Sequence, residues 1–249
     1  MAKVHNMALV SVGAQKLFYH GSQSISGQLI ASSTKGDTLS FNPYVEQFKG
    51  KCFSEVFTST PVRLIAQDSI INDSAYNNLE LLPNTLGVLE RTPAKGYKML
   101  NDKNIGNIQQ MAKIYPNADA FMFVRANYKV EKVMSFTTGS GGLMGEIDLA
   151  GFARVTASYY VSIYNRNGER IMFYRTRVHW SKSMFPFALS LGFNEKSKQA
   201  LTEADQYAYN DFRKHLQWKL NSMKEEQTKE KSKKHLKWKS KSLKKTKSK

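Results

Sequence analysis

The dipeptide Asn167-Gly168 constrains this chain more than any other feature, because it lies between two stretches in which apolar and polar residues alternate. Asn-Gly is the pair that a two-residue type I′ turn prefers, and strict alternation is typical of a strand with one buried face. The first stretch spans about 154–163 and the second about 172–180. The sequence therefore predicts a β-hairpin in an antiparallel sheet with one covered face and one partly solvated face.

The rest of the body predicts a mixture of helices and strands. Apolar runs and alternation indicate strands, and apolar residues at helical spacing indicate helices. Strands are expected at about 4–12, 62–66 and 120–133, and helices at about 42–57, 105–115 and 195–221. The resulting order, β-α-β-α-β-β-β-α, predicts an α/β (α+β) fold with a mixed sheet, an antiparallel hairpin half and a long C-terminal helix. We expect residues 1–223 to form this single domain; residues 68–98 give no clear pattern.

The formal net charge of +17 is concentrated at the C-terminal end. Residues 224–249 contain 12 Lys and 3 Glu, so slightly more than half of the net charge lies in this segment. Such a composition predicts a disordered, lysine-rich tail that binds polyanions. The contacts that we expect from it are Lys233, Lys234, Lys237, Trp238, Lys239, Lys244 and Lys245. Lipid or teichoic phosphates, RNA and an acidic protein all fit such a tail, and so does a solvated tail with no dedicated partner.

A second basic surface is predicted on the hairpin. Arg175 and Arg177 are expected to share a strand face with Phe173 and His179, and Arg154 lies on the partner strand. Arginines beside aromatic rings bind RNA or another polyanion through phosphate contacts and stacking. The alternative is a solvated sheet edge whose charge prevents pairing with another chain.

A glycine-rich stretch precedes the hairpin and includes Gly139, Gly141, Gly142 and Gly145. Its spacing differs from the dinucleotide-binding pattern and it lacks the Gly-Lys-Ser/Thr ending of a phosphate loop. It also lies between two expected strands, so no helix N-terminus follows it to receive a phosphate. The sequence favours a connecting loop here, with a contact role as the alternative.

The sequence contains no recognised catalytic or metal-binding set. Cys52 is the only cysteine and lies in an apolar helical pattern, so a buried thiol is expected. No histidine has a partner at a metal-site spacing, and no Gly-x-Ser-x-Gly motif is present. Glu146 and Asp148 fit a solvated strand edge better than an acid pair. We therefore predict no cofactor, no metal and no enzymatic activity, while an enzyme of unfamiliar type remains the third alternative.

Three segments resemble a group of exported bacterial α/β domains. Residues 4–12 read VHNMALVSV, residues 117–120 read NADA at the start of a central strand, and residues 161–168 read VSIYNRNG. The group includes the curli secretion-channel subunit, the lipoprotein activators of penicillin-binding proteins and the amino-terminal domain of the Tol-system propeller protein. The chain is also similar to exported bacterial proteins whose mature part begins with a "kva-v-v" strand. Unlike the lipoproteins, it has no lipobox cysteine near its start.

The resemblance implies an interaction or scaffold domain of the periplasm or cell envelope rather than an enzyme. The leading hypothesis is a non-enzymatic envelope protein whose basic tail contacts an anionic surface or an acidic partner. The alternative is a cytoplasmic protein that binds nucleic acid with its tail and its hairpin arginines. No apolar run is long enough for a transmembrane segment, and Met1–Asn6 is unlike a signal peptide, so we expect an export signal to be missing from this chain.

Overall fold

The computed structural model describes residues 4–19, 41–66, 68–83, 88–137, 148–188 and 195–246. Eight strands of this part form one mixed sheet, which confirms the predicted α/β class. The strands are β1 (Asn6–Tyr19), β2 (Arg63–Leu64), β3 (Val88–Pro93), β4 (Ala120–Thr137), β5 (Asp148–Asn165), β6 (Arg170–Arg175), β7 (His179–Trp180) and β8 (Phe185–Ala188). The helices are α2 (Asn42–Lys51), with a π-helical turn at Cys52–Val56, α3 (Asp68–Ile71), a 3₁₀ turn at Ala75–Asn78, α4 (Ile105–Ile114) and α5 (Glu195–Thr246).

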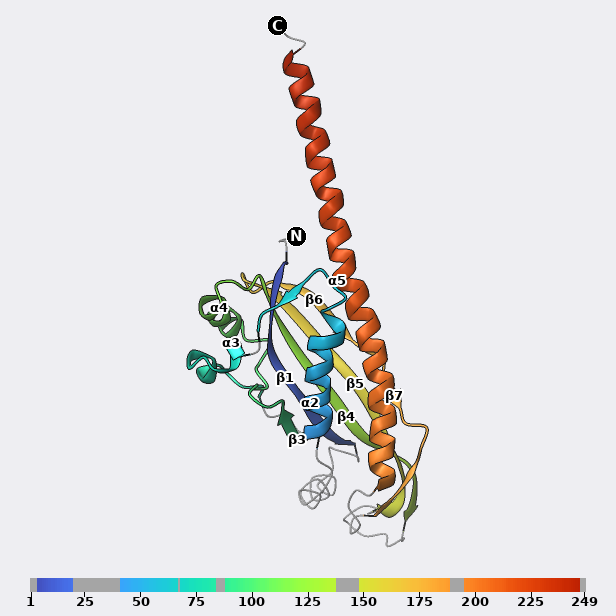
Figure 1. The fold of residues 1–249 in the computed structure, drawn as a ribbon. Helices are drawn as coiled ribbons and strands as arrows, with labels where there is room; N and C mark the ends of the chain where they lie inside the picture. Colours follow the sequence, from blue (N-terminus) through green and yellow to red (C-terminus); the bar gives the residue numbers. More distant parts are fainter. Residues whose placement is uncertain are drawn as a thin grey trace.

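Three long strands form the centre of the sheet (Figure 1). β1 runs parallel to β4, and β4 pairs antiparallel with β5 over nearly their whole length. β2 and β3 share the outer side of β1, while β6, β7 and β8 share the outer side of β5. The sheet therefore combines parallel and antiparallel pairing, as the order of the elements predicted.

The predicted hairpin is present as β5 and β6, but its turn is not the two-residue type I′ turn that Asn-Gly suggested. A type I′ turn needs positive φ at both central residues, whereas in this turn only Gly168 has one, at 83°. The Asn165 side chain closes a longer turn instead: its Oδ1 accepts hydrogen bonds from the backbone N–H groups of Asn167 and Glu169, each at 2.9 Å. The Asn165 side chain therefore stabilises a longer turn in place of the expected type I′ turn.

The second strand of the hairpin is interrupted between Arg175 and His179. Arg175 pairs with Tyr160 and His179 pairs with Ala157, so the outer strand uses four steps where β5 uses three. One extra residue in a strand reverses the faces of the side chains that follow it. The prediction that Arg175 and His179 share a face is therefore wrong: His179 Nε2 lies 3.2 Å from Asp211 Oδ2 of α5.

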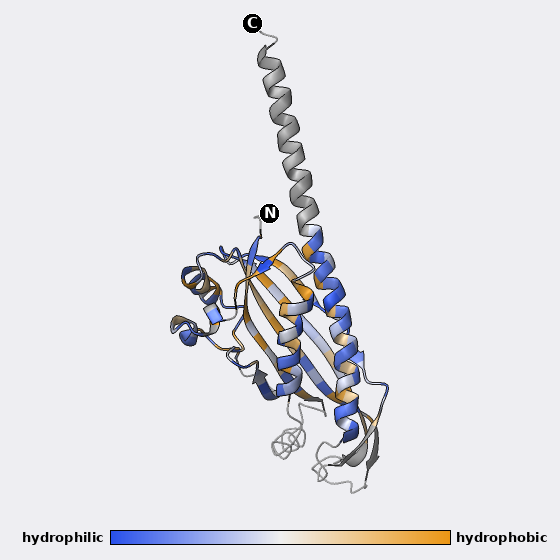
Figure 2. Cartoon of the chain, in the orientation of Figure 1, coloured by the Kyte–Doolittle hydropathy of each residue, from blue (hydrophilic) through white to orange (hydrophobic). Residues whose placement is uncertain are grey.

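Helices α2 and α5 cover one face of the sheet, side by side (Figure 1). The predicted apolar stripe of α5 is buried there, namely Leu201, Ala204, Ala208, Phe212, Leu216 and Leu220. Phe212 packs against Phe48 of α2 and Tyr159 of β5, with ring centroids 5.4 Å apart in both pairs. Cys52 is fully buried in this layer, as predicted. Figure 2 shows the apolar residues of the sheet beneath these two helices.

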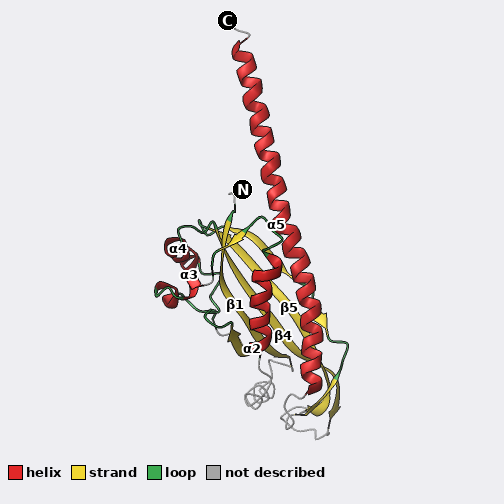
Figure 3. Cartoon of the chain, viewed as in Figure 1, coloured by secondary structure: helices red, strands yellow, loops and turns green. Residues whose placement is uncertain are grey.

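Described helices cover the opposite face of the sheet only at one end. Here α3, the 3₁₀ turn and α4 pack on the first residues of β1 and β4 (Figure 3). Arg166, in the turn between β5 and β6, holds α4 to this turn. Its guanidinium donates hydrogen bonds to the carbonyls of Ala112, Pro116 and Ala118 around the C-terminus of α4. It is therefore occupied as a helix cap.

Helix α5 extends beyond its expected end near Asn221 and runs on to Thr246. The sequence predicted a disordered tail from residue 224, whereas the backbone of this segment is helical as far as Thr246. The physical reason is that 195–246 contains no Gly or Pro and is rich in Lys, Glu and Leu, which are good helix formers. Glu225 and Glu230 also stand four residues before Lys229 and Lys234, a spacing that supports a helix.

The glycine-rich stretch with Gly139, Gly141, Gly142 and Gly145 lies outside the described residues, as does Glu146. Its predicted contact role therefore stays a prediction. Among the helices of the described ranges, none combines the length and the apolar character that crossing a membrane requires.

Candidate functional site

The part of the sheet face that α3 and α4 leave uncovered carries a row of three large side chains. Arg125 of β4 pairs with Tyr160 of β5, and Tyr160 pairs with Arg175 of β6. Because directly paired residues point to the same face, the three side chains lie in one line across the strands. We call this line the arginine row, and the surface around it the open face, because no described helix packs over it.

The two arginines approach the ring of Tyr160 from its two neighbouring strands. The guanidinium carbon of Arg125 lies 5.1 Å from the ring centroid, and that of Arg175 lies 4.9 Å from it. Both distances fall within the range of cation–π attraction. The ring therefore holds two positive groups in place, with Arg175 exposed and Arg125 half-buried. The Nε atom of Arg125 is buried without a hydrogen-bond partner.

A third arginine adds positive charge beside the row. Arg91 of β3 pairs with Gln15 of β1, and Gln15 pairs with Asn127 of β4, one step along the open face from Arg125. The Arg91 guanidinium donates a hydrogen bond of 2.6 Å to the carbonyl of Leu82. Burial, followed by the positive charge of Arg125, lowers the pKa of Arg91. The charges of Arg91 and Arg125 therefore repel each other on this face.

The acidic groups beside these arginines have other partners in the described chain: Glu131, which lies opposite Arg154, is ion-paired with Lys129 at 2.9 Å. Within the described ranges, Arg125, Arg154 and Arg175 form no ion pair. The carboxylate of Asp102, at the edge of the row, accepts a 2.8 Å hydrogen bond from the Ser162 hydroxyl. A hollow of about 30 Å³ between Asp102, Tyr160 and Phe173 has room for about one water molecule. The site is therefore a charged surface rather than a deep pocket.

Exposed aromatic side chains lie on the same face. Phe173 precedes Arg175 on β6 and is 53% exposed, and Trp180 of β7 is 47% exposed. Trp180 is paired with Thr156, which lies on the open face two alternations away from Tyr160. The Arg170 guanidinium carbon lies 5.0 Å from the centroid of the Phe173 ring. The exposed parts of rings on a sheet surface can stack on flat groups of a ligand. The open face thus combines guanidinium groups with stacking surfaces.

Of the predicted contacts on the hairpin, the structure places Arg154 and Arg175 on the open face and Arg177 apart from them. Arg154 is half-buried on β5 and pairs with Glu131. Arg177 is exposed in the interruption between β6 and β7, where its backbone N–H donates to Asp211.

The predicted tail contacts, six lysines and Trp238 among residues 233–245, lie within α5. Their side chains are not among those that the structure describes.

Sequence reasoning missed Arg91, Arg125 and Tyr160 as site residues. The alternation of residues 120–133 did place Arg125 on the polar face of its strand. What it could not supply was the pairing across β3, β1, β4, β5 and β6 that assembles the row.

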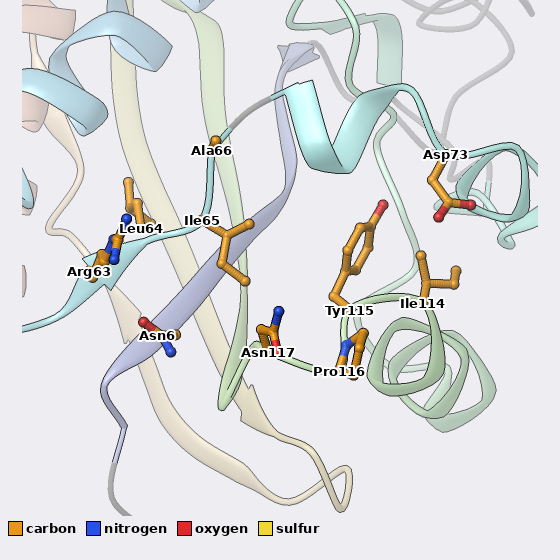
Figure 4. A pocket seen from close by; sticks show the side chains of 10 residues that line it. All are labelled: Asn6, Arg63, Leu64, Ile65, Ala66, Asp73, Ile114, Tyr115, Pro116 and Asn117. Atoms are coloured by element: carbon orange, nitrogen blue, oxygen red, sulfur yellow. The ribbon is translucent and has the colours of Figure 1, made fainter.

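A larger cavity of about 530 Å³ opens at the amino ends of β1, β2 and β4. Figure 4 shows its charged side chains, Arg63 and Asp73, at opposite ends of the lining. Asp73 accepts a hydrogen bond from the backbone N–H of Ala75, and the Tyr115 hydroxyl donates to the carbonyl of Ile70. The Asp73 carboxylate and the Tyr115 hydroxyl are therefore used within the fold, and the two charged side chains do not converge on one point. Across the described ranges, no three His, Cys, Asp or Glu side chains form a cluster suited to a metal ion.

A buried carboxylate lies between α5 and the sheet. Asp205 Oδ1 accepts hydrogen bonds from the hydroxyls of Tyr128 and Tyr159, each at 2.5 Å. Burial raises the pKa of Asp205, while the two hydroxyls and the charge of Lys51 oppose the rise. Because all three polar groups are satisfied inside the core, this cluster fixes α5 on the sheet and offers no ligand site.

The chain matches no family model and no curated protein. Among solved structures it is similar to a neuraminyllactose-binding hemagglutinin homolog from Helicobacter pylori, with a TM-score of 0.39 and 11% identity over 93% of this chain and 91% of that one. It is also similar to lipoprotein GNA1162 from Neisseria meningitidis, with a TM-score of 0.27 and 10% identity over 82% of this chain and 99% of that one. At these scores neither neighbour bears on the chemistry of the arginine row.

Proposed function

We propose that this chain is a non-enzymatic binding protein of the bacterial cell envelope, and that its open face binds an anionic polymer. The observation that carries the proposal is the arginine row, in which Arg125 and Arg175 flank the ring of Tyr160. A concentration of like charges raises the energy of the free protein, and an anionic ligand would lower it. The arrangement therefore favours a polyanion over a neutral partner.

The kind of contact follows from the side chains. Arginine donates hydrogen bonds from a planar fork that fits phosphate and carboxylate groups. The two arginines stand on β4 and β6, two strand spacings or roughly 10 Å apart, so they would contact two different groups of one ligand. A polymer with repeated anionic groups meets this requirement better than a single small anion.

The basic C-terminal segment forms a second part of the proposed function. Residues 224–249 carry 12 Lys against 3 Glu, and we propose that this segment contacts an anionic surface while residues 1–223 form the binding domain. The envelope assignment follows the sequence resemblance to exported bacterial domains. It is tested by fractionation of the native organism, where recovery of the protein only in the cytoplasm would overturn it.

The binding proposal is tested with inorganic polyphosphate, a phosphate polymer without bases. The full chain and its Arg125→Gln/Arg175→Gln variant are titrated at several salt concentrations. Loss of two phosphate contacts should reduce the slope of log affinity against log salt by about 1 to 2. A matched control is Arg166→Gln, because Arg166 is engaged at the end of α4 and away from the open face. Unchanged affinity and slope in the Arg125/Arg175 variant would contradict the proposal.

The second candidate is a protein that binds single-stranded nucleic acid. The specific observation in its favour is the pair of exposed rings, Phe173 and Trp180, on the same face as the arginines. Stacking on bases would make poly(U) RNA bind more tightly than polyphosphate, and Phe173→Ala with Trp180→Ala would remove the difference. Equal affinity for both polymers would reject this candidate and leave the envelope polyanion.

A further inference from the structure

The solvent side of α5 carries two exposed aromatic side chains. Trp218 is 62% exposed and Tyr207 is 40% exposed. They are 11 residues apart, which is close to three full helical turns, so they lie on one line along the helix over about 16 Å. The opposite side of the same helix is buried, with Phe212 and Leu216 fully covered by the sheet. Both rings are therefore open to solvent over a large part of their surface.

Lysines accompany both rings. Lys219 Nζ lies 5.9 Å from the ring of Trp218, and Lys182 Nζ lies 5.8 Å from that of Tyr207. Lys214 is exposed between the two rings. Lysine ends combined with tryptophan and tyrosine rings are the side chains enriched where a protein meets the headgroups of a bilayer.

The nearby acids are engaged within the fold. Asp211 binds His179 and the Tyr174 hydroxyl, and Glu203 accepts hydrogen bonds from Ser183. Beyond Trp218 the same helix continues to Thr246, and residues 219–246 contain 11 Lys against 3 Glu. The charge of this side of α5 is thus complementary to an anionic surface.

We propose that the solvent side of α5, from Tyr207 through Trp218 into the basic segment, lies on the surface of a bilayer with anionic headgroups. A straight helix with its aromatic side chains in one line fits a flat surface, and each lysine close to anionic lipids strengthens binding about fivefold. The inference rests on the proposed function in one respect, since it names the partner of the basic segment. Because α5 and the open face lie on opposite sides of the sheet, a bilayer and a polymer can be bound together.

Binding is measured by co-sedimentation of the full chain with vesicles of phosphatidylcholine containing phosphatidylglycerol. We expect strong binding to these vesicles and little binding to phosphatidylcholine alone. The variant Tyr207→Ala/Trp218→Ala should bind the anionic vesicles roughly tenfold more weakly, because it loses both interfacial rings. Trp180→Ala is the matched control: it also removes an exposed tryptophan, but from the open face. Equal binding by the Tyr207/Trp218 variant and the wild type would overturn the inference.

A spectroscopic measurement reports on Trp218 directly. In the variant Trp180→Phe/Trp238→Phe, Trp218 is the only tryptophan left in the chain. Its emission should shift to shorter wavelength and its quenching by acrylamide should fall when anionic vesicles are added. Emission and quenching that do not change on binding would show that α5 does not touch the bilayer.

The two proposals fail in different ways. Suppose that the Arg125→Gln/Arg175→Gln variant binds vesicles as the wild type does, and that the wild type does not bind polyphosphate. This result would contradict the open-face proposal and support the bilayer contact. If the chain binds polyphosphate but not vesicles of either composition, the bilayer contact falls and the open face stands.

Discussion

The guanidinium carbon of Arg125 lies 5.1 Å from the centre of the Tyr160 ring, to which it is joined by direct pairing of β4 and β5. Arg175 reaches the same ring from β6, at 4.9 Å. One tyrosine thus holds two like charges on the open face, and its ring is the element on which their placement depends.

Replacement of Tyr160 tests this role. Tyr160→Phe keeps the ring and should leave polyphosphate affinity within about twofold of wild type, whereas Tyr160→Leu removes the ring and should weaken it about three- to tenfold. Affinity is measured by titration at low salt, where charge effects are largest. An equal loss in both variants would show that the hydroxyl, rather than the ring, matters.

Helix α5 is held by its buried stripe and not by its exposed rings. Phe212→Ala removes a fully buried ring that contacts Phe48 and Tyr159, and should lower the free energy of unfolding by about 3–5 kcal/mol. Trp218→Ala, on the solvent side of the same helix, should change it by less than about 0.5 kcal/mol. Urea unfolding of both variants measures the difference, and similar losses would contradict the assignment of the two sides.

Asp205 gives a pH-dependent prediction. Its pKa in the folded chain is raised above the ordinary value of 3.8, first by burial, so the folded state keeps a proton that the unfolded state has lost. Its contribution to the free energy of unfolding therefore falls as the pH rises from the ordinary aspartate range through the raised pKa. Asp205→Asn cannot ionise, so the variant should gain stability relative to wild type over this range. Urea unfolding at a series of pH values checks the trend, and a difference that is constant with pH would contradict it.

A companion variant separates charge from hydrogen bonding at the same position. Asp205→Ala leaves the hydroxyls of Tyr128 and Tyr159 without their shared acceptor and should cost about 2–4 kcal/mol. Asp205→Asn retains an oxygen acceptor and should be much less costly. Thermal unfolding at neutral pH ranks the two, and the reverse order would show that the tyrosines find other acceptors.

Arg166 should behave as a structural residue. Its fork reaches three carbonyls at the C-terminus of α4, namely those of Ala112, Pro116 and Ala118. Lysine carries the same charge but cannot span them, so Arg166→Lys should lower the free energy of unfolding by about 1–3 kcal/mol while polyphosphate binding is retained. A stable variant with weakened binding would instead place Arg166 in the site.

Local patterns predicted the elements of the fold well where one face of an element is buried. The α5 stripe from Leu201 to Leu220 and the alternation from Val124 to Val130 are both confirmed by burial. In these segments each apolar position has a sheet or helix to face, so the periodicity of the sequence follows the periodicity of the contacts. The hairpin was predicted for the same reason.

The predictions from sequence were wrong or incomplete where a single residue, or a strand distant in the sequence, decides the local structure. One extra residue between Arg175 and His179 reversed a face that simple alternation had extended through Trp180. The turn after Asn165 took its shape from a side-chain oxygen rather than from Asn167-Gly168. The arginine row needed strand pairings between distant segments, and periodicity assigns faces but not partners.

The parallel pairing of β1 with β4 has a consequence for how the chain reaches its fold. Asn6 and Asp119, which are joined by a hydrogen bond at the start of this pairing, are 113 residues apart in the sequence. During synthesis β1 therefore lacks its central neighbour β4 until about half of the chain has emerged. The sheet cannot form during this interval. A chaperone that shields an apolar amino-terminal segment can act in this time, and so can a transport step that needs an unfolded chain.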